Sequence, residues 1–406
     1  MSREMKHSGI DWIGTVPKTW AVKKIGNLYR VRNEKVSDKD YPPLSVTMKG
    51  VLPQLETAAK TNNGDDRKLV RKGDFAINSR SDRRGSCGVS SYDGSVSLIN
   101  TILTPISQMN PQYYNWLFHT TLFADEFYKW GHGIVDDLWT TRWQEMKNIS
   151  IVFPPLSEQQ KIADYLDKVC GEIDGLVALQ EAMIDELKAY KQSVITEAVT
   201  RGLNPNVPLK PSGIDWIGEI PEHWKIIKVG FLFANLDYLR KPISAEHRER
   251  NNPQYDYYGA SGIIDKIDYY NVDDEVLLIG EDGANLVMRN LPLVYKAKGR
   301  FWVNNHAHIL KPISDDYNYM AHVLEAADYN DYITGSAQPK LSQDNLLSVK
   351  LPVAPLTEQQ QIASYLDTKC SEIDSLIAIK QQKIEELKGY KKSIIYEYVT
   401  GKKEVV

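Results

Sequence analysis

Residues 8–14 read Ser-Gly-Ile-Asp-Trp-Ile-Gly, and residues 212–218 repeat the same seven residues. The residues that follow also recur, because Pro17 and Trp20 return 204 residues later as the same residue types. A match of this length at a fixed separation is an internal repeat, which takes precedence over other signals in assigning a fold. The chain of 406 residues is therefore predicted to be a duplicated half-molecule.

A second segment is shared further along the chain. Residues 155–160 read Pro-Leu-Ser-Glu-Gln-Gln and residues 355–360 read Pro-Leu-Thr-Glu-Gln-Gln, now 200 residues apart. The blocks between the shared segments, 21–154 and 225–354, have 134 and 130 residues and almost no similarity. Such a period is much longer than that of a solenoid, where repeats have roughly 20–50 residues. The two halves thus kept their flanks alike while their centres diverged.

The shared segment at 155–160 opens a stretch that predicts a long helix. From residue 157 to about residue 200 there is no proline, and apolar residues alternate in steps of four and three, which is heptad spacing. Ser157 and Gln160 suit the N-cap and capping-box positions, and Gly202 with Pro205 ends the pattern. The heptad residues are Ile162, Leu166, Val169, Ile173, Leu176, Met183, Leu187, Tyr190 and Val194, and in the second half Ile362, Leu366, Ile373, Leu376, Ile384, Leu387, Tyr390 and Ile394.

These patterns predict an α+β fold with two mixed α/β domains. Two long antiparallel helices join the domains and form a coiled-coil rod with a pseudo-two-fold axis. The expected boundaries are 1–156 for the first domain, 157–202 for the first helix, 203–356 for the second domain and 357–400 for the second helix. Short β-prone runs in the first domain, separated by turns such as Lys72-Gly73-Asp74, indicate a twisted, partly curled sheet, and residues 113–130 are predicted to be helical.

The cysteines and the apolar runs restrict the class of protein. Cys87, Cys170 and Cys370 have no CxxC spacing, which argues against a disulfide scaffold and a zinc site. Cys170 and Cys370 occupy equivalent places in the two helices and are expected to be packing residues. No apolar run approaches the ~20 residues of a membrane span, and the N-terminus lacks the apolar core of a signal peptide. We expect a cytoplasmic protein without a membrane partner.

Charge is concentrated locally rather than overall. The net charge is −4, but residues 67–84 contain seven basic and two acidic residues, and residues 286–311 contain five Lys or Arg, two His and no acidic residue. A single charged run is more often a solvated surface, but one basic segment in each diverged block favours a DNA-binding face in each domain. Residues 157–201 instead have nine acidic and five basic residues, which is typical of a spacer and a protein-binding surface.

Side chains that suit DNA contacts occur in and around the basic segments. Arginine pairs with guanine, and asparagine or glutamine pairs with adenine, each through two hydrogen bonds in the major groove. The residues expected to contact DNA are Lys72, Ser79, Arg80, Arg83, Arg84, Thr141, Arg142, Ser261, Arg300, Asn304, Asn305, His306, Gln338 and Lys340. Which of them read bases and which hold phosphates is left open by the sequence.

No motif for catalysis accompanies these segments. The chain has no G-x-x-x-x-G-K-[S/T] phosphate-binding loop, and His119, His132, His306 and His308 do not have the spacing of metal ligands. Residues 110–113, Asn-Pro-Gln-Tyr, are similar to a loop of amino-methyltransferases, but they lack its second proline and a preceding glycine-rich loop. We interpret this similarity as chance and expect a non-catalytic chain that binds no cofactor and no metal.

The order of domain, helix, domain and helix resembles the specificity subunits of Type I restriction-modification systems. The resemblance covers essentially the whole chain and rests on the G-I-D-W-I-G…P…W signature that opens each domain and the P-L-[S/T]-E-Q-Q signature that ends it. The Lys72-Gly73-Asp74 turn, followed by Gly85, Gly88 and Asp93-Gly94, and the closing segment 335–341 of the second domain also resemble that family. The closing segment of the first domain, 131–138, lacks a counterpart of Gln338, so Thr140, Thr141 and Arg142 are considered there instead.

The resemblance implies a division of labour among several subunits. Each domain would bind one half of a bipartite, asymmetric double-stranded DNA target, and the helices would set the unread spacer. Two methyltransferase subunits would dock on the helices and domains, with Gln159, Gln160, Gln359 and Gln360 at the contact, and would methylate one adenine in each half with S-adenosylmethionine. Separate restriction and translocase subunits would use ATP and Mg²⁺ to cut unmethylated DNA in defence against phage.

Two other classes of protein are kept as alternatives. A structural or interaction protein with two β-rich domains on a coiled coil explains the helices and the missing chemistry, but it does not explain the diverged centres or the paired basic segments. Salt-sensitive duplex binding in a complex separates it from a DNA-specificity subunit. A nuclease with an unrecognised active site would cut DNA by itself in a metal-dependent manner.

Overall fold

The computed structural model describes residues 3–54, 64–80, 83–134, 139–248, 251–335 and 338–405. The chain divides into two compact units. Unit 1 consists of residues 1–181 and 382–406, and unit 2 consists of residues 182–381. Each unit therefore contains one diverged block and part of both long helices, whereas the boundaries expected from the sequence give each helix a segment of its own.

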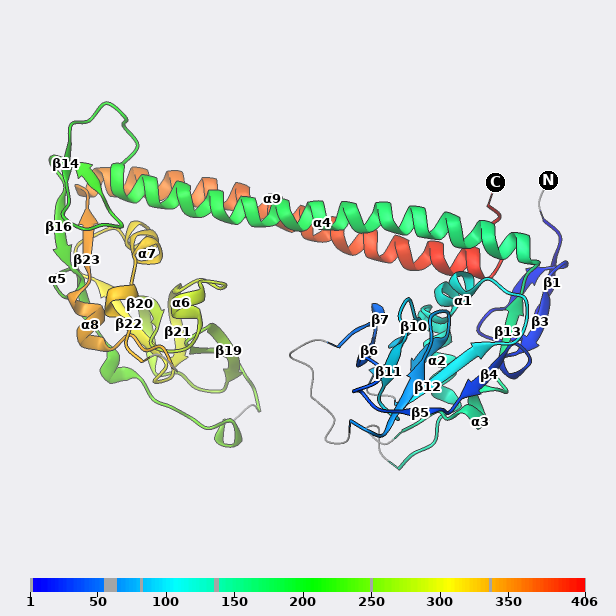
Figure 1. The fold of residues 1–406 in the computed structure, drawn as a ribbon. Helices are drawn as coiled ribbons and strands as arrows, with labels where there is room; N and C mark the ends of the chain where they lie inside the picture. The colour runs from blue at the N-terminus through cyan, green and yellow to red at the C-terminus, as the bar shows by residue number, and fades with distance from the viewer. Residues whose placement is uncertain are drawn as a thin grey trace. The chain divides into compact units, whose positions relative to one another are not determined.

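The diverged block of unit 1 is a mixed α/β domain built on two small sheets (Figure 1). One sheet has the strand order β10-β9-β12-β4 and the other β11-β8-β5, and β6 pairs with β7 as a hairpin. The strands are β1 (Met5–His7), β2 (Thr15–Pro17), β3 (Ala21–Lys24), β4 (Tyr29–Arg32), β5 (Lys35–Val36), β6 (Leu44–Thr47), β7 (Gly50–Pro53), β8 (Arg67–Val70), β9 (Phe75–Asn78), β10 (Cys87–Val89), β11 (Gly94–Val96), β12 (Asn100–Pro105) and β13 (Ser150–Phe153). The helices are α1 (Pro111–Phe118), α2 (Thr121–Lys129) and α3 (Trp143–Met146). The predicted helical stretch 113–130 is thus two helices, because Thr120 caps a second helix with its side chain.

The diverged block of unit 2 has one larger sheet with the order β17-β22-β20-β21-β18-β19. Gly280 at the end of β20 lies so close to the backbone oxygen of Ala260 that a Cβ atom there would be 2.7 Å from it, so this position favours glycine. The strands are β14 (Leu209–Pro211), β15 (Glu219–Pro221), β16 (Lys225–Lys228), β17 (Phe233–Asn235), β18 (Tyr255–Gly259), β19 (Gly262–Ile267), β20 (Val272–Gly280), β21 (Val294–Val303), β22 (Ala307–Pro312) and β23 (Lys350–Val353). The helices are α5 (Val229–Leu232), α6 (Asn285–Met288), α7 (Tyr317–Ala326) and α8 (Gln343–Ser348).

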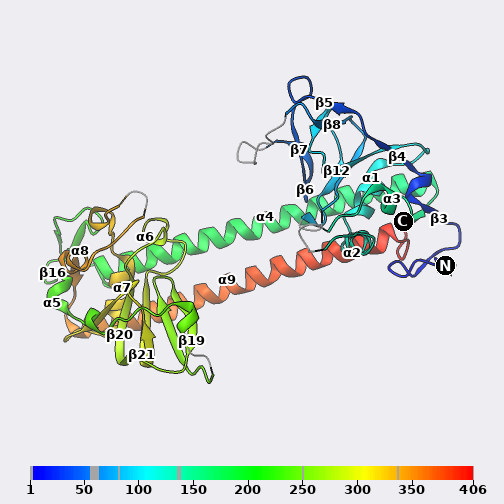
Figure 2. The ribbon, with the colours of Figure 1, turned by 90° about the horizontal axis from the view of Figure 1, so that it is seen from below.

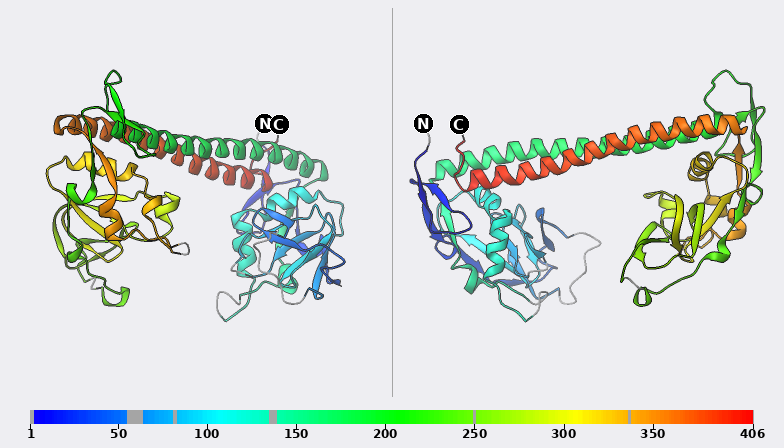
Figure 3. Two further views of the ribbon diagram at one scale, coloured as in Figure 1. Left: turned by 60° about the vertical axis from the view of Figure 1, so that its left-hand side comes forward. Right: turned by 180° about the vertical axis from the view of Figure 1, so that it is seen from behind.

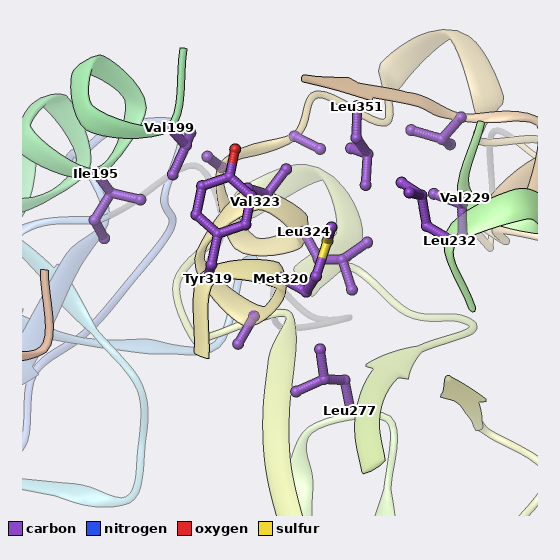
Figure 4. Packing of buried hydrophobic residues seen from close by; sticks show 14 of the residues in the cluster. Ile195, Val199, Val229, Leu232, Leu277, Tyr319, Met320, Val323, Leu324 and Leu351 are labelled. Carbon is purple, nitrogen blue, oxygen red and sulfur yellow. The ribbon is translucent and has the colours of Figure 1, made fainter. Parts of the chain in front are cut away.

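A single apolar core joins the sheet of unit 2 to the helices. Figure 4 shows Tyr319, Met320 and Val323 of α7 between Val199 of the first long helix and Leu277 of β20. All five side chains are buried, and burial of apolar area is the main favourable term in folding. Unit 1 has the equivalent core, in which α1 packs between its sheet and the long helices. Each domain is therefore packed firmly onto the helical part of its own unit.

The two long helices are α4 (Leu156–Arg201) and α9 (Leu356–Val399), and both are unbroken (Figure 2). Each begins one residue before the predicted start, so Ser157 lies inside the first turn and is not the N-cap. The backbone N–H groups of Glu158 and Gln159 donate to the oxygen of Pro155, which opens the helix. Gly202 follows α4 with a φ of +73°, a left-handed conformation that ends helices and that glycine adopts at no steric cost.

The buried seam of α4 has the heptad spacing, but its register differs from the predicted one. Leu166 and Ile173 are buried as expected, whereas Leu176 and Tyr190 are exposed. Cys170 and Ile184 are buried instead and continue the alternation of four and three from Leu166. The same holds in α9, where Leu366, Cys370, Ile373 and Ile384 are buried and Leu376 and Tyr390 are exposed. Apolar residues at neighbouring positions on the helix surface made the two registers look alike in the sequence.

Within each unit the two helices pack together. In unit 1 the ring of Tyr165 lies 4.5 Å from that of Tyr398, and Lys391 pairs with Asp174 at 2.7 Å. These two contacts run in opposite directions along α4 and α9, so the helices are antiparallel in this unit. In unit 2 Lys191 pairs with Asp374, also at 2.7 Å. The two ion pairs use equivalent positions of the repeat with the helices exchanged, as a duplicated structure requires.

The shared signatures connect the helix ends with the domains. The indole nitrogen of Trp20 donates to Glu158 at 2.9 Å, and that of Trp224 donates to Glu358 at 3.0 Å. Near the C-terminus, Lys402 donates to the carbonyl oxygen of Ile13 at 2.6 Å, so both termini lie in unit 1 close to the first signature (Figure 3). The signatures therefore stayed alike for structural reasons. No helix within the described residues combines the length and apolarity that crossing a bilayer requires.

Candidate nucleic-acid interface

Both domains present the same arrangement of loops at one edge of their sheet. In the first domain the backbone N–H of Thr141 donates to Ser79 at 2.9 Å, and isolated bridges join Thr140 to Arg80 and to His132. In the second domain the corresponding N–H of Leu341 donates to Glu281 at 2.8 Å, and the bridges join Lys340 to Asp282 and to Thr334. We call this surface the loop edge. It consists of residues 78–80, 97–100, 132–134 and 139–142 in the first domain, and of residues 280–282, 304–307, 334–335 and 338–342 in the second.

A third segment completes each loop edge. The N–H of Ser79 donates to Ile99 at 3.3 Å, and the N–H of Glu281 donates to His306 at 2.9 Å. Because the backbone partners match, positions can be equated between the domains although their sequences are dissimilar. Arg80 corresponds to Asp282, Thr140 to Lys340 and Ser79 to Glu281. The scaffold is thus shared, while the side chains that it carries differ.

Several predicted DNA-binding residues of the first domain meet at its loop edge. Arg80 and Arg142 are exposed there, and Arg83 and Arg84 are exposed in the turn that follows β9. The guanidinium of Arg84 pairs with Asp125 and lies 4.7 Å from the ring centre of Tyr128, so this side chain is held in place. The four arginines form the most basic part of the first domain's edge.

The second domain brings its predicted residues together in a corresponding way. Asn305, His306, Gln338 and Lys340 are exposed at the loop edge. Ser261 is exposed in the turn between β18 and β19, beside Ala260, which touches Gly280. The amino group of Lys340 pairs with Glu281 at 2.9 Å, and the ring of His306 pairs with Asp282 at 2.7 Å. Unlike the arginines of the first domain, these side chains are set among carboxylates.

Two predicted residues lie away from the loop edges. Lys72 precedes β9, whereas Arg80 follows it, so the strand separates them and the basic segment 67–84 is not one patch. Arg300 lies within β21, where its guanidinium pairs with Asp273 at 2.9 Å and stacks over Tyr270. Their assignment to the DNA-contacting set stays a prediction, but they do not lie with the others at the loop edges, because distance along the chain is not distance in the fold.

Three further predicted residues are buried, and their side chains form hydrogen bonds inside the domains. The hydroxyl of Ser79 bonds with that of Thr101 at 2.8 Å, and the hydroxyl of Thr141 donates to the oxygen of Phe127 at 2.7 Å. Asn304 accepts the N–H of His306 at 2.8 Å. Side chains used in this way support the loops from within and cannot reach a nucleic acid without breaking those bonds.

The acid-free segment 286–311 is neutralised by residues from elsewhere in the chain. Lys298 pairs with Glu275 at 3.3 Å, Lys311 with Asp274 at 2.7 Å, and Lys296 with Asp367 at 3.2 Å. Arg289 donates to the backbone oxygens of Glu325 and Ala327. The sequence predicted a free positive surface for this stretch. Because β20 and α9 supply the missing acids, the structure does not have one there.

The glutamines that were expected to contact a partner divide into two kinds. Gln159 is fully buried, accepts the N–H of Asn110 at 2.8 Å and donates to the oxygen of Pro154 at 2.8 Å. Gln359 is equally buried and accepts the N–H of Asp316 at 2.7 Å. Their assignment to a partner contact was wrong, because they fasten the helix start to the domain. Gln160 and Gln360 are exposed, and Gln160 accepts a hydrogen bond from Asn110 and donates one to Asp164, each at 2.7 Å.

The loop edge of the first domain contains a hollow that no sequence pattern predicted. It has a volume of about 340 Å³, and its lining includes Asn33, Lys68, Ser79, Thr101, Thr140 and Arg142. The amino group of Lys68 donates to the backbone oxygen of Asn100 at 2.7 Å, and burial lowers the pKa of Lys68. Asn33 is 46 residues from Ser79 along the chain, so only the pairing of β4 with β12 brings it here.

The second domain fills the equivalent place with an ionic network that sequence reasoning also missed. The Nδ1 atom of the buried His308 lies 2.6 Å from a carboxylate oxygen of Asp237. Arg240 bridges Asp237 and Glu281, and Glu281 also pairs with Lys340. Burial alone would raise the pKa of Glu281, but Lys340 and Arg240 outweigh it and hold that pKa below the usual value.

The loop edges contain no metal site among the described residues, and their closing segments are described only in part. Among the residues that the structure describes, no group of three or more His, Cys, Asp or Glu side chains is placed to hold a metal ion. The closing segments fall partly outside the described residues, namely 135–138 in the first domain and 336–337 in the second.

Comparison with known proteins agrees with the fold and the duplication. The family described as "Type I restriction modification DNA specificity domain" matches residues 17–188 and 221–389, one match in each half. Since the two matches cover most of the chain, the protein belongs to this family, as a specificity subunit of the Type I restriction-modification class. The resemblance inferred from the sequence is thereby confirmed.

Individual relatives bear the same description. The chain is 23% identical to the Type I restriction enzyme MjaVIII specificity subunit of Methanocaldococcus jannaschii over 428 residues, which covers 95% of this chain and 93% of that protein. It is 34% identical over 122 residues, or 29% of each chain, to the Type I restriction enzyme EcoprrI specificity subunit of Escherichia coli. A solved chain from a study of complex assembly and conformational transition of the type I R-M system has a TM-score of 0.72 at 13% identity, over 95% of this chain and 98% of that one. That structure supports the fold.

Proposed function

We propose that this specificity subunit reads a bipartite, asymmetric double-stranded DNA target, one half with the loop edge of each domain. The recognition domains are residues 1–156 and 203–356. The observation that carries the proposal is the shared edge scaffold with different side chains, such as Arg80 against Asp282 and Arg142 against Ser342. Phosphate contacts position a protein on DNA, and base contacts specify the sequence, so one scaffold with two side-chain sets suits two different half-sites.

The exposed side chains at the edges fit this division. Arginines such as Arg80 and Arg142 suit guanine or phosphate, and the amides of Asn305 and Gln338 suit adenine. Lys340 adds a cation at the second edge. The helices 157–202 and 357–400 would form the antiparallel rod with a pseudo-two-fold axis that spaces the half-sites.

The helices also carry surfaces that fit a partner present in two copies. Apolar residues at equivalent positions have nearly equal exposure, 47% for Leu176 and Leu376, and 58% and 57% for Tyr190 and Tyr390. The third pair, Leu179 and Ile379, is exposed as well. Such apolar patches on a charged helix mark a protein interface. We assign them to two methyltransferase subunits, which would also contact Gln160 and Gln360 at the starts of the helices.

The chemistry belongs to the partners in this proposal. The methyltransferase subunits would use S-adenosylmethionine to methylate adenine, and restriction and translocase subunits would use ATP and Mg²⁺ to cleave DNA. This chain would bind none of these cofactors and would direct the complex in the cytoplasm.

Methylation sequencing tests the proposal. The chain is co-expressed with the methyltransferase subunit encoded beside it, and host DNA is sequenced for N6-methyladenine. We expect one bipartite motif with a methylated adenine in each half, and a change in only one half when residues 225–354 are exchanged for those of another such domain. A stable complex that methylates no motif would contradict the proposal.

A matched pair of variants locates the reading surface. Arg80→Ala removes a cation at the loop edge, and Lys72→Ala removes one at the other end of β9. Loss of a good base contact costs ~1–3 kcal/mol, so Arg80→Ala is expected to weaken or relax recognition of one half-site by roughly tenfold or more. Lys72→Ala should leave the motif unchanged, and equal effects of the two variants would place the contact elsewhere.

A further inference from the structure

Four matched positions at the two loop edges carry different chemistry. The pairing of β4 with β12, continued by one residue, places Asn33 opposite Thr101, and that of β17 with β22, continued by two residues, places Asp237 opposite His308. The set in the first domain is Asn33, Ser79, Thr101 and Thr140, and the set in the second is Asp237, Glu281, His308 and Lys340. The first set is neutral throughout, whereas every member of the second is ionisable. In the first set the hydroxyls of Ser79 and Thr101 bond with each other, whereas in the second set charged groups pair.

The hydrogen bonds of His308 define its protonation. The side chain is fully buried, with Nδ1 2.6 Å from Asp237 and Nε2 2.8 Å from the carbonyl oxygen of Leu341. A carbonyl oxygen only accepts hydrogen bonds, and so does an ionised carboxylate. Both ring nitrogens must therefore donate, which makes the ring an imidazolium in this arrangement.

The surroundings of Asp237 favour its ionised form. One carboxylate oxygen accepts the N–H of Ile309 at 2.8 Å, and the other lies 3.3 Å from Arg240. Burial raises the pKa of Asp237, but the hydrogen bond from His308 and the charges of His308 and Arg240 outweigh it and leave that pKa below the usual value. The remaining charged groups of the network are Glu281 and Lys340, and His306 pairs with Asp282 beside it.

We propose that His308 is a positioning residue for DNA reading by the second domain, because its imidazolium ties the Leu341 carbonyl to Asp237. The inference rests on the proposed function and deepens it. Leu341 directly follows Lys340 in the closing segment, which also carries Gln338, so the bond from His308 holds the backbone that presents both side chains. Without the ring, the Leu341 carbonyl and Asp237 lose the donor that ties them together. The first domain has no such tie, since Thr101 stands at the matched position and bonds with the hydroxyl of Ser79.

Amide hydrogen exchange on the complete chain without DNA tests the positioning. The amides of Lys340 and Leu341 are compared with those of Thr140 and Thr141, which make the matching backbone bonds in the first domain. After correction for intrinsic exchange, the protection of Lys340 and Leu341 is expected to be roughly tenfold lower in His308→Asn than in the unchanged chain, as loss of one charged hydrogen bond implies, while that of Thr140 and Thr141 stays the same. An equal response of all four amides would overturn the inference.

DNA binding gives the second readout. The complex with the methyltransferase is titrated with two duplexes, each bearing one half of the motif found by methylation sequencing and an unrelated sequence in place of the other half. In His308→Asn, affinity for the half read by the second domain should fall, while affinity for the first half stays constant. Equal losses for both halves contradict the inference. Reduced protection in a chain that yields no motif would instead count against the proposed function alone.

Two variants separate positioning from general stability. Gln at 308 places its amide near the Nε2 site and can still donate to Leu341, whereas Asn places its amide near the Nδ1 site and serves Asp237. His308→Gln should therefore keep more of the protection at Lys340 and Leu341 and bind the second half-site better than His308→Asn. Equal or better binding by His308→Asn would disprove the role. Binding to the first half-site shows that each variant is folded.

Discussion

At the scale of single residues, buried polar side chains determine how each long helix joins its domain. Gln359 accepts the N–H of Asp316 and donates to Asp315 and to the backbone oxygen of Ala354, at 2.7, 2.7 and 2.9 Å. A buried polar group that loses its partner costs about 1–3 kcal/mol, which exceeds the typical net gain from one hydrogen bond. The pair of glutamines in each shared signature therefore has two roles, one structural and one at the surface.

Replacing the buried glutamine should be much more damaging than replacing its neighbour. Gln359→Ala leaves the N–H of Asp316 without its acceptor, so the free energy of unfolding is expected to fall by about 1–3 kcal/mol. Denaturant unfolding measures this change. Gln360→Ala is the control, since an exposed position away from special features changes stability by ~0.5 kcal/mol or less. Equal losses for the two variants would refute the structural role of Gln359.

At the scale of elements, α4 and α9 each have two apolar faces with different tasks. The seam, with Leu366, Cys370 and Ile373 in α9, packs within the molecule. The second face, with Leu376 and Ile379, is exposed. A helix that served only as a spacer would gain nothing from exposed apolar residues, so the second face fits the proposed docking of a partner.

Two leucines of α9 distinguish these faces. Leu366→Ala is expected to lower the free energy of unfolding by about 2–5 kcal/mol, because it leaves a cavity in a packed seam. Leu376→Ala should change the stability of the free chain by ~0.5 kcal/mol or less. Only Leu376→Ala should weaken the complex with the methyltransferase at unchanged stability, as native mass spectrometry of its stoichiometry would detect. An unaffected complex would remove the exposed face from the docking surface.

At the scale of the whole molecule, the duplication yields two units. In each unit the shared signature contacts the start of the long helix. Trp20 and Trp224 are fully buried at equivalent places, and each donates to the glutamate at the start of the long helix in its unit. Each unit contains segments distant in sequence, since unit 1 joins residues 1–181 to 382–406. The units are therefore expected to respond separately to damage in their cores.

Hydrogen exchange can resolve the two units. Trp20→Ala is expected to cost about 3–5 kcal/mol in unit 1, because a large buried aromatic side chain is lost. Amides in residues 1–181 and 382–406 should lose protection, while those in residues 182–381 keep theirs. Trp224→Ala is the reciprocal control and should reverse the pattern. Loss of protection in both units from either variant would show that they unfold as one.

The family, the duplication and the long helices could be predicted from the sequence, because these features depend on short-range patterns. A repeat is visible wherever it occurs, and heptad spacing without proline specifies a helix through local geometry. Even so, Leu176 was assigned to the buried seam and is exposed, because several apolar residues share neighbouring positions on the helix surface. The sequence predicted the helix, but which side of the helix is buried depends on the element that packs against it.

The loop edges depended on contacts between distant residues. Arg80, Arg142 and Gln338 are exposed at the loop edges, whereas Lys72 and Arg300, which the sequence grouped with them, lie elsewhere in the domains. Lys298 and Lys311 looked unpaired because their acidic partners on β20 lie 23 and 37 residues away. The duplicated architecture was thus determined by the sequence itself. The partners of its charged and polar groups were decided by the tertiary structure, because strand pairing and burial bring together residues that no local pattern connects.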